Sequence, residues 1–283
     1  MTPAASDTWL DDEQAALPAP AVACSVVRVR AGQMARAPQD DLLAEETPVA
    51  LAYNGISHAT MLVTPEHLED FAVGFSLTEG IIDHVREIRD IRLDVQSQGV
   101  VIELDIAGAP MDRLKIRRRA MAGRTGCGLC GVETLPEVLR DIAPVGAGTQ
   151  WSAQRLAHGM RAMREQQTLH TRTGATHAAA WLNPQGEVVC VREDVGRHNA
   201  LDKLLGALAR RDCAPADGAV LVSSRASFEM VQKAASRGAT LLAAVSAPTA
   251  LAQRVATRSN VTLLGFFRDS DFSIYSHPQR VRT

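Results

Sequence analysis

The chain has 283 residues, of which 46% are hydrophobic and 22% are charged, and its formal net charge is −2. This composition is typical of a globular protein, and the length suffices for one large domain or two smaller ones. The small net charge excludes a global attraction to nucleic acid or membranes, so any electrostatic attraction must be local. No apolar run approaches the roughly 20 residues that a membrane helix requires.

Residues 1–24 are predicted to form a flexible tail. The stretch up to Pro20 carries several acidic residues and lacks a basic start followed by an apolar run. This pattern does not fit a secretory signal, so we expect a cytoplasmic protein whose thiols stay reduced.

Residues 25–107 are predicted to form a small β-rich α+β domain. Asn54-Gly55 separates two apolar strands, and this dipeptide accepts the positive φ angles of a tight hairpin turn. A second hairpin is expected further along the segment. Thr64-Pro65 predicts the start of a helix, with threonine as the N-cap and proline in the first helical position.

Residues 108–131 are predicted to form a basic, glycine-rich loop that carries a CxxC pair. The pair is Cys127 and Cys130, with glycines beside both and a basic run over residues 115–119 just upstream. Thiolates are nucleophiles, and nearby arginines lower the pKa of a thiol. A mobile segment with a reactive thiol is therefore expected.

Two other interpretations of the CxxC pair stay open. A thioredoxin-like redox pair requires a CxxC that opens a helix after a strand, whereas this pair follows a basic loop. A closed zinc site requires four ligands, and the other cysteines, Cys24, Cys190 and Cys213, stand alone at poor spacing.

Residues 132–283 are predicted to form a larger α/β domain. Ser152 is a suitable N-cap for a long amphipathic helix, and the final third alternates between strands and helices. Such alternation predicts parallel neighbouring strands with right-handed crossovers.

Polar loops follow two predicted strands of this domain. Ser223, Ser224 and Arg225 come directly after a buried strand, and Ser246 occupies the equivalent position one unit later. Ligands bind at the carboxyl ends of parallel strands, and hydroxyls, arginine and free helix amides suit phosphate. We therefore expect a phosphorylated ligand at this edge.

A third loop follows the last predicted strand. Arg268 suits a phosphate, Phe266 or Phe267 suits stacking on a flat heterocycle, and Asp269 or Asp271 suits a guanine edge. The alternative is a surface loop with a core phenylalanine.

The segment 194–199, Asp-Val-Gly-Arg-His-Asn, has two interpretations as well. Arg197 and His198 offer donors to an anion, while Gly196 and Asn199 fit ordinary helix capping. Deaminase chemistry is poorly supported, because zinc deaminases use H-x-E and position 179 after His177 is alanine.

Taken together, these motifs closely resemble the FdhD family of formate dehydrogenase accessory sulfurtransferases. The resemblance covers roughly residues 45–280 and rests on several long motifs in the same order. They are Val49 to His58, Gly74 to Ile82, Gly123 to Gly131, Thr176 to Trp181, Glu193 to His198, Val222 to Met230 and Tyr275 to Arg280.

The resemblance implies a function. Family members accept sulfur from a cysteine desulfurase as a persulfide and pass it to the molybdenum of the bis-molybdopterin guanine dinucleotide cofactor, before the cofactor enters formate dehydrogenase. By this pattern Cys127 is the persulfide carrier and Cys130 its partner. The resemblance also implies a homodimer and a cytidine-deaminase-like α/β fold, with a mixed sheet flanked by helices and a smaller N-terminal α+β domain.

A GDP-like nucleotide is the part of the cofactor that the polar loops are expected to contact. The residues predicted to do so are Ser223, Ser224, Arg225, Ser246, Phe266, Phe267, Arg268, Asp269, Ser270 and Asp271. The alternatives are a cofactor-binding chaperone without transfer chemistry and a zinc-binding protein that uses the CxxC pair.

Overall fold

A computed structural model describes residues 16–122 and 142–283, without the side chains of residues 116–122. The N-terminal part contains a four-stranded sheet in the order β6-β5-β8-β7. Its strands are β5 (Thr47–Tyr53), β6 (Ile56–Val63), β7 (Ile88–Gln96) and β8 (Gly99–Ile106). The predicted hairpin at Asn54-Gly55 is confirmed, since both residues have positive φ, at 48° and 78°.

Helix α1 (Leu68–Thr78) packs its apolar side chains onto this sheet. The predicted start at Thr64-Pro65 is wrong, because the N-cap is His67 with φ 55°. Thr64 is instead fully buried and holds a polar network described below. Threonine is a suitable helix cap, but here tertiary contacts occupy the polar groups of Thr64 instead.

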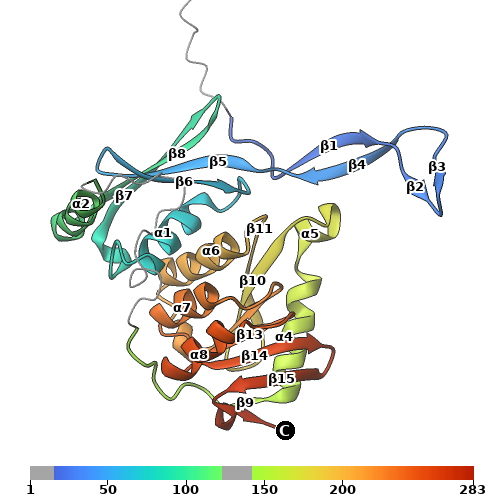
Figure 1. The fold of residues 1–283 in the computed structure, drawn as a ribbon. Helices are drawn as coiled ribbons and strands as arrows, with labels where there is room; N and C mark the ends of the chain where they lie inside the picture. The colour runs from blue at the N-terminus through green and yellow to red at the C-terminus, as the bar shows by residue number, and fades with distance from the viewer. Residues whose placement is uncertain (1–15, 123–141) are drawn as a thin grey trace, which may run out of the picture.

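A two-stranded arm precedes the sheet and projects away from the body of the molecule (Figure 1). It consists of β1 (Ala21–Val26) and β4 (Gln39–Ala44), and between them lie the short strands β2 (Val29–Arg30) and β3 (Gln33–Met34). The predicted tail over residues 1–24 therefore ends too late, because β1 pairs with β4 from Ala21 onward.

Residues 108–122 form helix α2 (Gly108–Ala122) instead of the first part of the predicted loop. Pro110 lies in the first helical turn, where its missing N–H costs nothing. The residues that follow are mostly good helix formers, so local propensity outweighed the expected glycine-rich loop.

The C-terminal part contains a six-stranded mixed sheet in the order β11-β10-β12-β13-β14-β15. Strands β12 to β14 run parallel, and the outer strands pair antiparallel. The strands are β10 (His177–Leu182), β11 (Val188–Asp194), β12 (Ala219–Val222), β13 (Leu241–Ala244), β14 (Thr262–Arg268) and β15 (Asp271–Ser276). The predicted mixed sheet with flanking helices is confirmed. Strand β15 has no counterpart among the strands predicted from the sequence.

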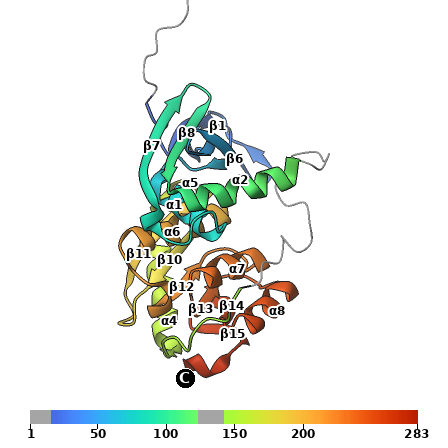
Figure 2. The same cartoon turned by 90° about the vertical axis from the view of Figure 1, so that its left-hand side faces the viewer.

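Helices cover both faces of this sheet (Figure 1, Figure 2). One core lies under α6 (Arg197–Arg210), α7 (Phe228–Ser236) and α8 (Ala250–Arg258). The other lies under α4 (Ala153–Glu165), whose predicted N-cap Ser152 accepts a hydrogen bond from the Arg155 N–H at 3.2 Å. None of the helices in the described parts of the chain is long and apolar enough to cross a membrane.

The two sheets are joined by a close crossing of α1 and α6. A Cβ added at Gly74 would lie 1.7 Å from the Asp202 carbonyl oxygen, and one added at Gly206 would lie 1.9 Å from the Asp70 carbonyl oxygen. Only glycine permits this approach, so the two parts of the chain are packed against each other backbone to backbone.

Candidate functional site

Three predicted loops meet at one edge of the six-stranded sheet. The Ser246 N–H donates to the Ser224 carbonyl at 3.3 Å, and the Phe266 N–H donates to the Ser246 carbonyl at 3.2 Å. Strands β12 to β14 are parallel, so their carboxyl ends share this edge. Residues that are 22 and 20 positions apart in the sequence are thereby placed side by side.

A cavity of about 520 Å³ with several polar side chains in its wall opens beside this edge. Ser223 and Val245 line it from the ends of β12 and β13. The Ser223 hydroxyl oxygen accepts the Ala178 N–H at 2.8 Å, which leaves the hydroxyl proton available to a ligand. The remaining lining residues are Arg164, Gln167, His170, Gly174, Ala175, Thr176 and His177.

Glu193 holds the opposite wall of this cavity in place. Its buried carboxylate accepts the N–H groups of Leu169 and His170, each at 2.8 Å, and the Thr176 hydroxyl at 3.0 Å. Both N–H groups belong to the first turn of α5 (Thr168–Thr173), where backbone donors are otherwise unpaired. Neither Glu193 nor α5 is among the site residues predicted from the sequence.

His177 is a titratable residue at the start of β10, where it lines the cavity. Burial, followed by the neighbouring charge of Arg197, lowers the pKa of His177 below its ordinary value. The lowered pKa favours the neutral form of His177, and Arg164 brings a positive charge to the cavity. The Arg164 guanidinium donates to the Phe267 carbonyl at 3.0 Å and so connects the cavity to the β14–β15 hairpin.

The predicted nucleotide contacts in the β14–β15 hairpin fall into two groups, one exposed and one buried. Phe266 is 44% exposed, with φ 55°, so its ring is accessible for stacking. Phe267 is fully buried and stacks on Phe272, with ring centroids 4.4 Å apart. The prediction that Phe267 contacts a ligand through its ring is therefore wrong. Arg268 and Asp271 are register partners of β14 and β15, and Asp269 and Ser270 lie in the turn between them.

The residues after β12 divide in the same way. Arg225 is exposed, whereas Ser224 is 4% exposed and its hydroxyl donates to the Arg225 carbonyl at 2.9 Å. Ser224 thus supports the loop from within and does not face a ligand, contrary to the prediction. Ser246 is partly exposed, next to both loops.

The segment 194–199 is mainly structural. The buried Asp194 carboxylate accepts the Thr64 N–H at 3.0 Å, the Gly196 N–H at 2.8 Å and the Asn199 amide at 3.1 Å. Gly196 is the N-cap of α6, and His198 pairs with Glu229 at 2.8 Å. Burial lowers the pKa of His198, whereas the charge of Glu229 acts in the opposite direction.

The two predicted transfer cysteines, Cys127 and Cys130, lie outside the described residues.

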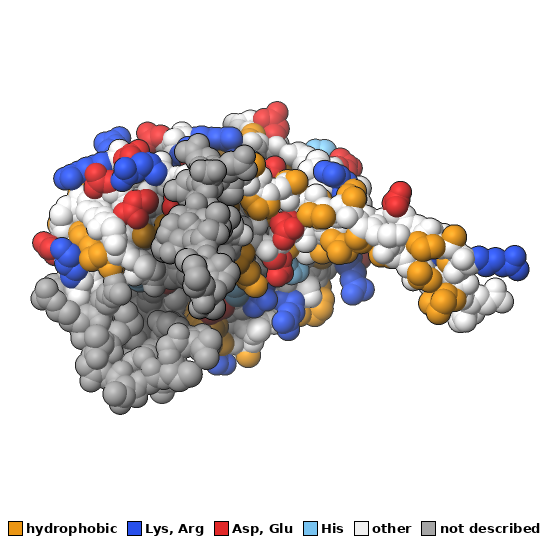
Figure 3. Space-filling view, turned by 90° about the horizontal axis from the view of Figure 1, so that it is seen from above, with side chains coloured by type: hydrophobic (Ala, Val, Ile, Leu, Met, Phe, Trp, Pro, Cys, Tyr) orange, Lys and Arg blue, Asp and Glu red, His pale blue; other side chains and the backbone are white. Residues whose placement is uncertain are grey.

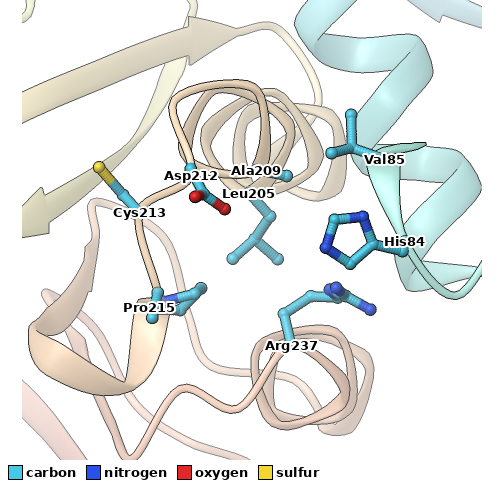
Figure 4. Close-up of a pocket in the computed structure, with 9 residues that line it drawn as sticks. His84, Val85, Leu205, Ala209, Asp212, Cys213, Pro215 and Arg237 are labelled. Carbon is cyan, nitrogen blue, oxygen red and sulfur yellow. The ribbon is translucent and has the colours of Figure 1, made fainter.

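A second, smaller cavity of about 240 Å³ lies between the two parts of the chain (Figure 4). His84 and Arg237 line one side, and Asp212 faces them from the end of α6. The sulfur of Cys213 points away from this cavity. None of the predicted site residues in the described part of the chain lines it.

A mixed sheet with helices on both faces defines this chain as a mixed α/β protein, with a cavity at the carboxyl edge of its parallel strands. The FdhD/NarQ family model matches residues 44–282, and the chain belongs to this family. It is 62% identical over 260 residues to a protein of Bordetella bronchiseptica named sulfur carrier protein FdhD. The alignment covers 92% of this chain and 94% of that protein.

Two further proteins support the assignment. A protein of the same name from Cupriavidus necator is 53% identical over 258 residues, covering 91% of this chain and 89% of that protein. The crystal structure of a putative formate dehydrogenase accessory protein from Desulfotalea psychrophila aligns with a TM-score of 0.73 and 25% identity. The alignment covers 93% of this chain and 99% of that one.

Proposed function

We propose that this protein is a sulfur carrier that serves the maturation of formate dehydrogenase. The observation that carries the proposal is the 62% identity, over 92% of the chain, to a protein named as a sulfur carrier. In this proposal a cysteine desulfurase supplies the sulfur, and the molybdenum of the bis-molybdopterin guanine dinucleotide cofactor receives it before the cofactor enters the enzyme. The protein acts in the cytoplasm as a homodimer with a cytidine-deaminase-like main domain.

Loading is a transfer between two thiols without net oxidation. The Cys127 thiolate attacks the terminal sulfur of a persulfide on the desulfurase, and the desulfurase cysteine leaves as a thiolate. Cys127 then carries the persulfide. The arginine-rich run over residues 115–119 supports this step, because positive charge stabilises both the attacking thiolate and the persulfide anion.

Release uses the second cysteine of the pair. The Cys130 thiolate attacks the inner sulfur of the Cys127 persulfide, and a disulfide forms between the two cysteines. The outer sulfur leaves as sulfide, since the two cysteines supply the two electrons. A thiol reductant then restores both cysteines before the next cycle.

The acceptor cofactor is a large polyphosphate, and the sheet edge offers suitable groups for its nucleotide part. Ser223 and Arg164 in the cavity donate hydrogen bonds suited to phosphate, and the exposed Arg225 adds positive charge. Phe266 is accessible for stacking on the guanine ring. These residues support a GDP-like ligand at this edge.

The proposal is tested by mass spectrometry after incubation with a cysteine desulfurase and cysteine. We expect one additional sulfur atom on Cys127 in the native chain and none at that position in Cys127→Ala. Cys213→Ala is the matched control and should load normally. Full formate dehydrogenase maturation by Cys127→Ala would overturn the assignment.

The second candidate is a chaperone that binds the cofactor without carrying sulfur. It is favoured by the same polar edge, which does not depend on either cysteine. In that case GDP would bind to the native chain and to Cys127→Ala alike, and no persulfide would form on either.

A further inference from the structure

The arm formed by β1 and β4 has more apolar surface than an isolated hairpin should expose. It extends well beyond the body of the molecule, and orange hydrophobic side chains follow its length in the space-filling view (Figure 1, Figure 3). A two-stranded hairpin alone in water is marginally stable at best. The large apolar side chains exposed on the arm and its tip are Val22 at 46%, Val27 at 51%, Val29 at 60%, Met34 at 71% and Leu43 at 55%.

One edge of the arm is open for strand pairing. Strand β4 lies against α5, whereas β1 is the outer strand and pairs only with β4 among the described residues. Alternate residues of an outer strand direct their N–H and C=O groups away from the sheet, so β1 presents a template for another strand.

The two edges of the arm differ in charge. Strand β1 has the sequence Ala-Val-Ala-Cys-Ser-Val and contains no charged residue, whereas β4 contains Asp40 and Asp41. Arg28 pairs with Asp41 at 3.0 Å and offsets part of this charge, but two copies of β4 would still bring two pairs of carboxylates together. Two copies of β1 meet without repulsion, and this difference favours a second copy at the β1 edge.

We propose that β1 pairs antiparallel with β1 of a second copy, which turns two hairpins into one four-stranded sheet. This inference rests on the homodimer included in the proposed function and assigns it a surface. A two-fold axis makes such an interface self-complementary. Val22 and Leu43 are register partners and share one face, so each copy contributes an exposed apolar pair to the new sheet.

The residue types also select a register. With the axis at Cys24, Val22 of each copy lies opposite Val26 of the other, which places two pairs of β-branched side chains across the interface. Cys24 then lies opposite Cys24 of the other copy. Directly opposed residues have Cα atoms about 4.5–5.5 Å apart, which is within the range for a disulfide.

Thiol cross-linking tests this register. In a chain where Cys24 is the only cysteine, through C127S, C130S, C190A and C213S, the oxidant diamide takes up the two protons and two electrons released when two thiols join. We expect a covalent dimer within minutes. The control moves the single cysteine to the tip, through Cys24→Ala with Met34→Cys, and should stay uncross-linked. Equal cross-linking at both positions would overturn the register.

Solution association tests the surface without any cysteine chemistry. Cys24→Lys in the otherwise native chain places two ammonium groups face to face at the axis, and we expect the dimer Kd from sedimentation to rise at least about tenfold. Met34→Lys is the matched control and should leave Kd unchanged. A native chain that is monomeric at tens of micromolar, or a dimer insensitive to Cys24→Lys, would overturn the proposal.

Hydrogen exchange separates a second copy from another partner. Amides of residues 21–26 should become protected as the protein concentration rises. Protection that appears only when a cysteine desulfurase is added would overturn the pairing of two copies. Persulfide on Cys127 is measured separately, so a monomer that still loads sulfur refutes this interface and the homodimer but leaves sulfur carriage intact.

Discussion

Lys203 and Asp194 form an ion pair with 2.7 Å between Nζ and Oδ2, and both side chains are fully buried. Lys203 also donates to the Thr64 carbonyl at 2.9 Å, so the pair ties the six-stranded sheet to the segment that leads into α1. Burial lowers the pKa of Lys203, while the charge of Asp194 acts in the opposite direction. The pair is thus a structural joint between the two parts of the chain.

Removal of the lysine charge is expected to destabilise the fold strongly. Lys203→Met leaves the Asp194 carboxylate buried without its cation, and such losses typically cost about 3–5 kcal/mol. Urea denaturation would measure the change in the free energy of unfolding. Arg92→Met is the control, because Arg92 and Asp90 form an exposed pair at 3.4 Å that contributes little. Similar losses in both variants would contradict the structural role of Lys203.

The helix crossing at Gly74 should tolerate no side chain. Gly74→Ala would place a Cβ 1.7 Å from the Asp202 carbonyl oxygen, so α1 and α6 must move apart. We expect a loss of about 1–3 kcal/mol or more in the free energy of unfolding. Gly108→Ala is the matched control, since a Cβ there meets nothing within 4 Å. Equal denaturation midpoints for Gly74→Ala and the native chain would refute the close crossing of α1 and α6.

Local patterns predicted the elements whose signal lies in neighbouring residues. The turn at Asn54-Gly55 and the cap at Ser152 are confirmed because backbone geometry alone decides them. Thr64 has the same local signal for a cap, but Asp194, which is 130 positions away in the sequence, accepts its N–H. Such long-range polar contacts are not visible in a local pattern.

Sequence patterns were limited in the same way for the candidate site. Strand order placed the loops after β12 and β13 together, as the alternating pattern predicted. The orientation of each side chain depends on packing, so Phe266 and Phe267 could not be separated from sequence alone. The two-residue period of a strand would have separated them only if β14 had been extended to Arg268, since consecutive residues of a strand face opposite sides.

The pKa of His177 is expected to respond to phosphate. Because burial lowers this pKa, unfolding takes up a proton in the window between the lowered value and the ordinary value of about 6.5. Stability from His177 is therefore present above pH 6.5 and is lost as the pH falls. NMR titration of the imidazole should give a midpoint below 6.5, which GDP raises and guanosine does not. A midpoint unchanged by GDP would place its phosphates away from this cavity.

Cys130 is expected to matter less than Cys127. Cys130→Ala retains the thiol that receives sulfur, but it lacks the second thiol that releases sulfide as the disulfide forms. We expect normal persulfide loading with slower transfer in a formate dehydrogenase maturation assay, and addition of dithiothreitol should restore part of the rate. Loss of persulfide loading in Cys130→Ala would instead show that both cysteines take part in the first step.

Phe266 provides a direct test of nucleotide stacking at the sheet edge. Its ring is 44% exposed, so Phe266→Ala removes an accessible aromatic surface without opening the core. Stacking of a base on an aromatic ring contributes about 1–3 kcal/mol, so the Kd for GDP by calorimetry should rise roughly tenfold. Phe266→Trp should retain the affinity, and thermal unfolding should confirm that both variants fold. Because stacking depends on the base, the affinity for pyrophosphate should be the same in all three chains. A parallel loss of pyrophosphate binding in Phe266→Ala would instead indicate that the hairpin, and not the ring, had changed.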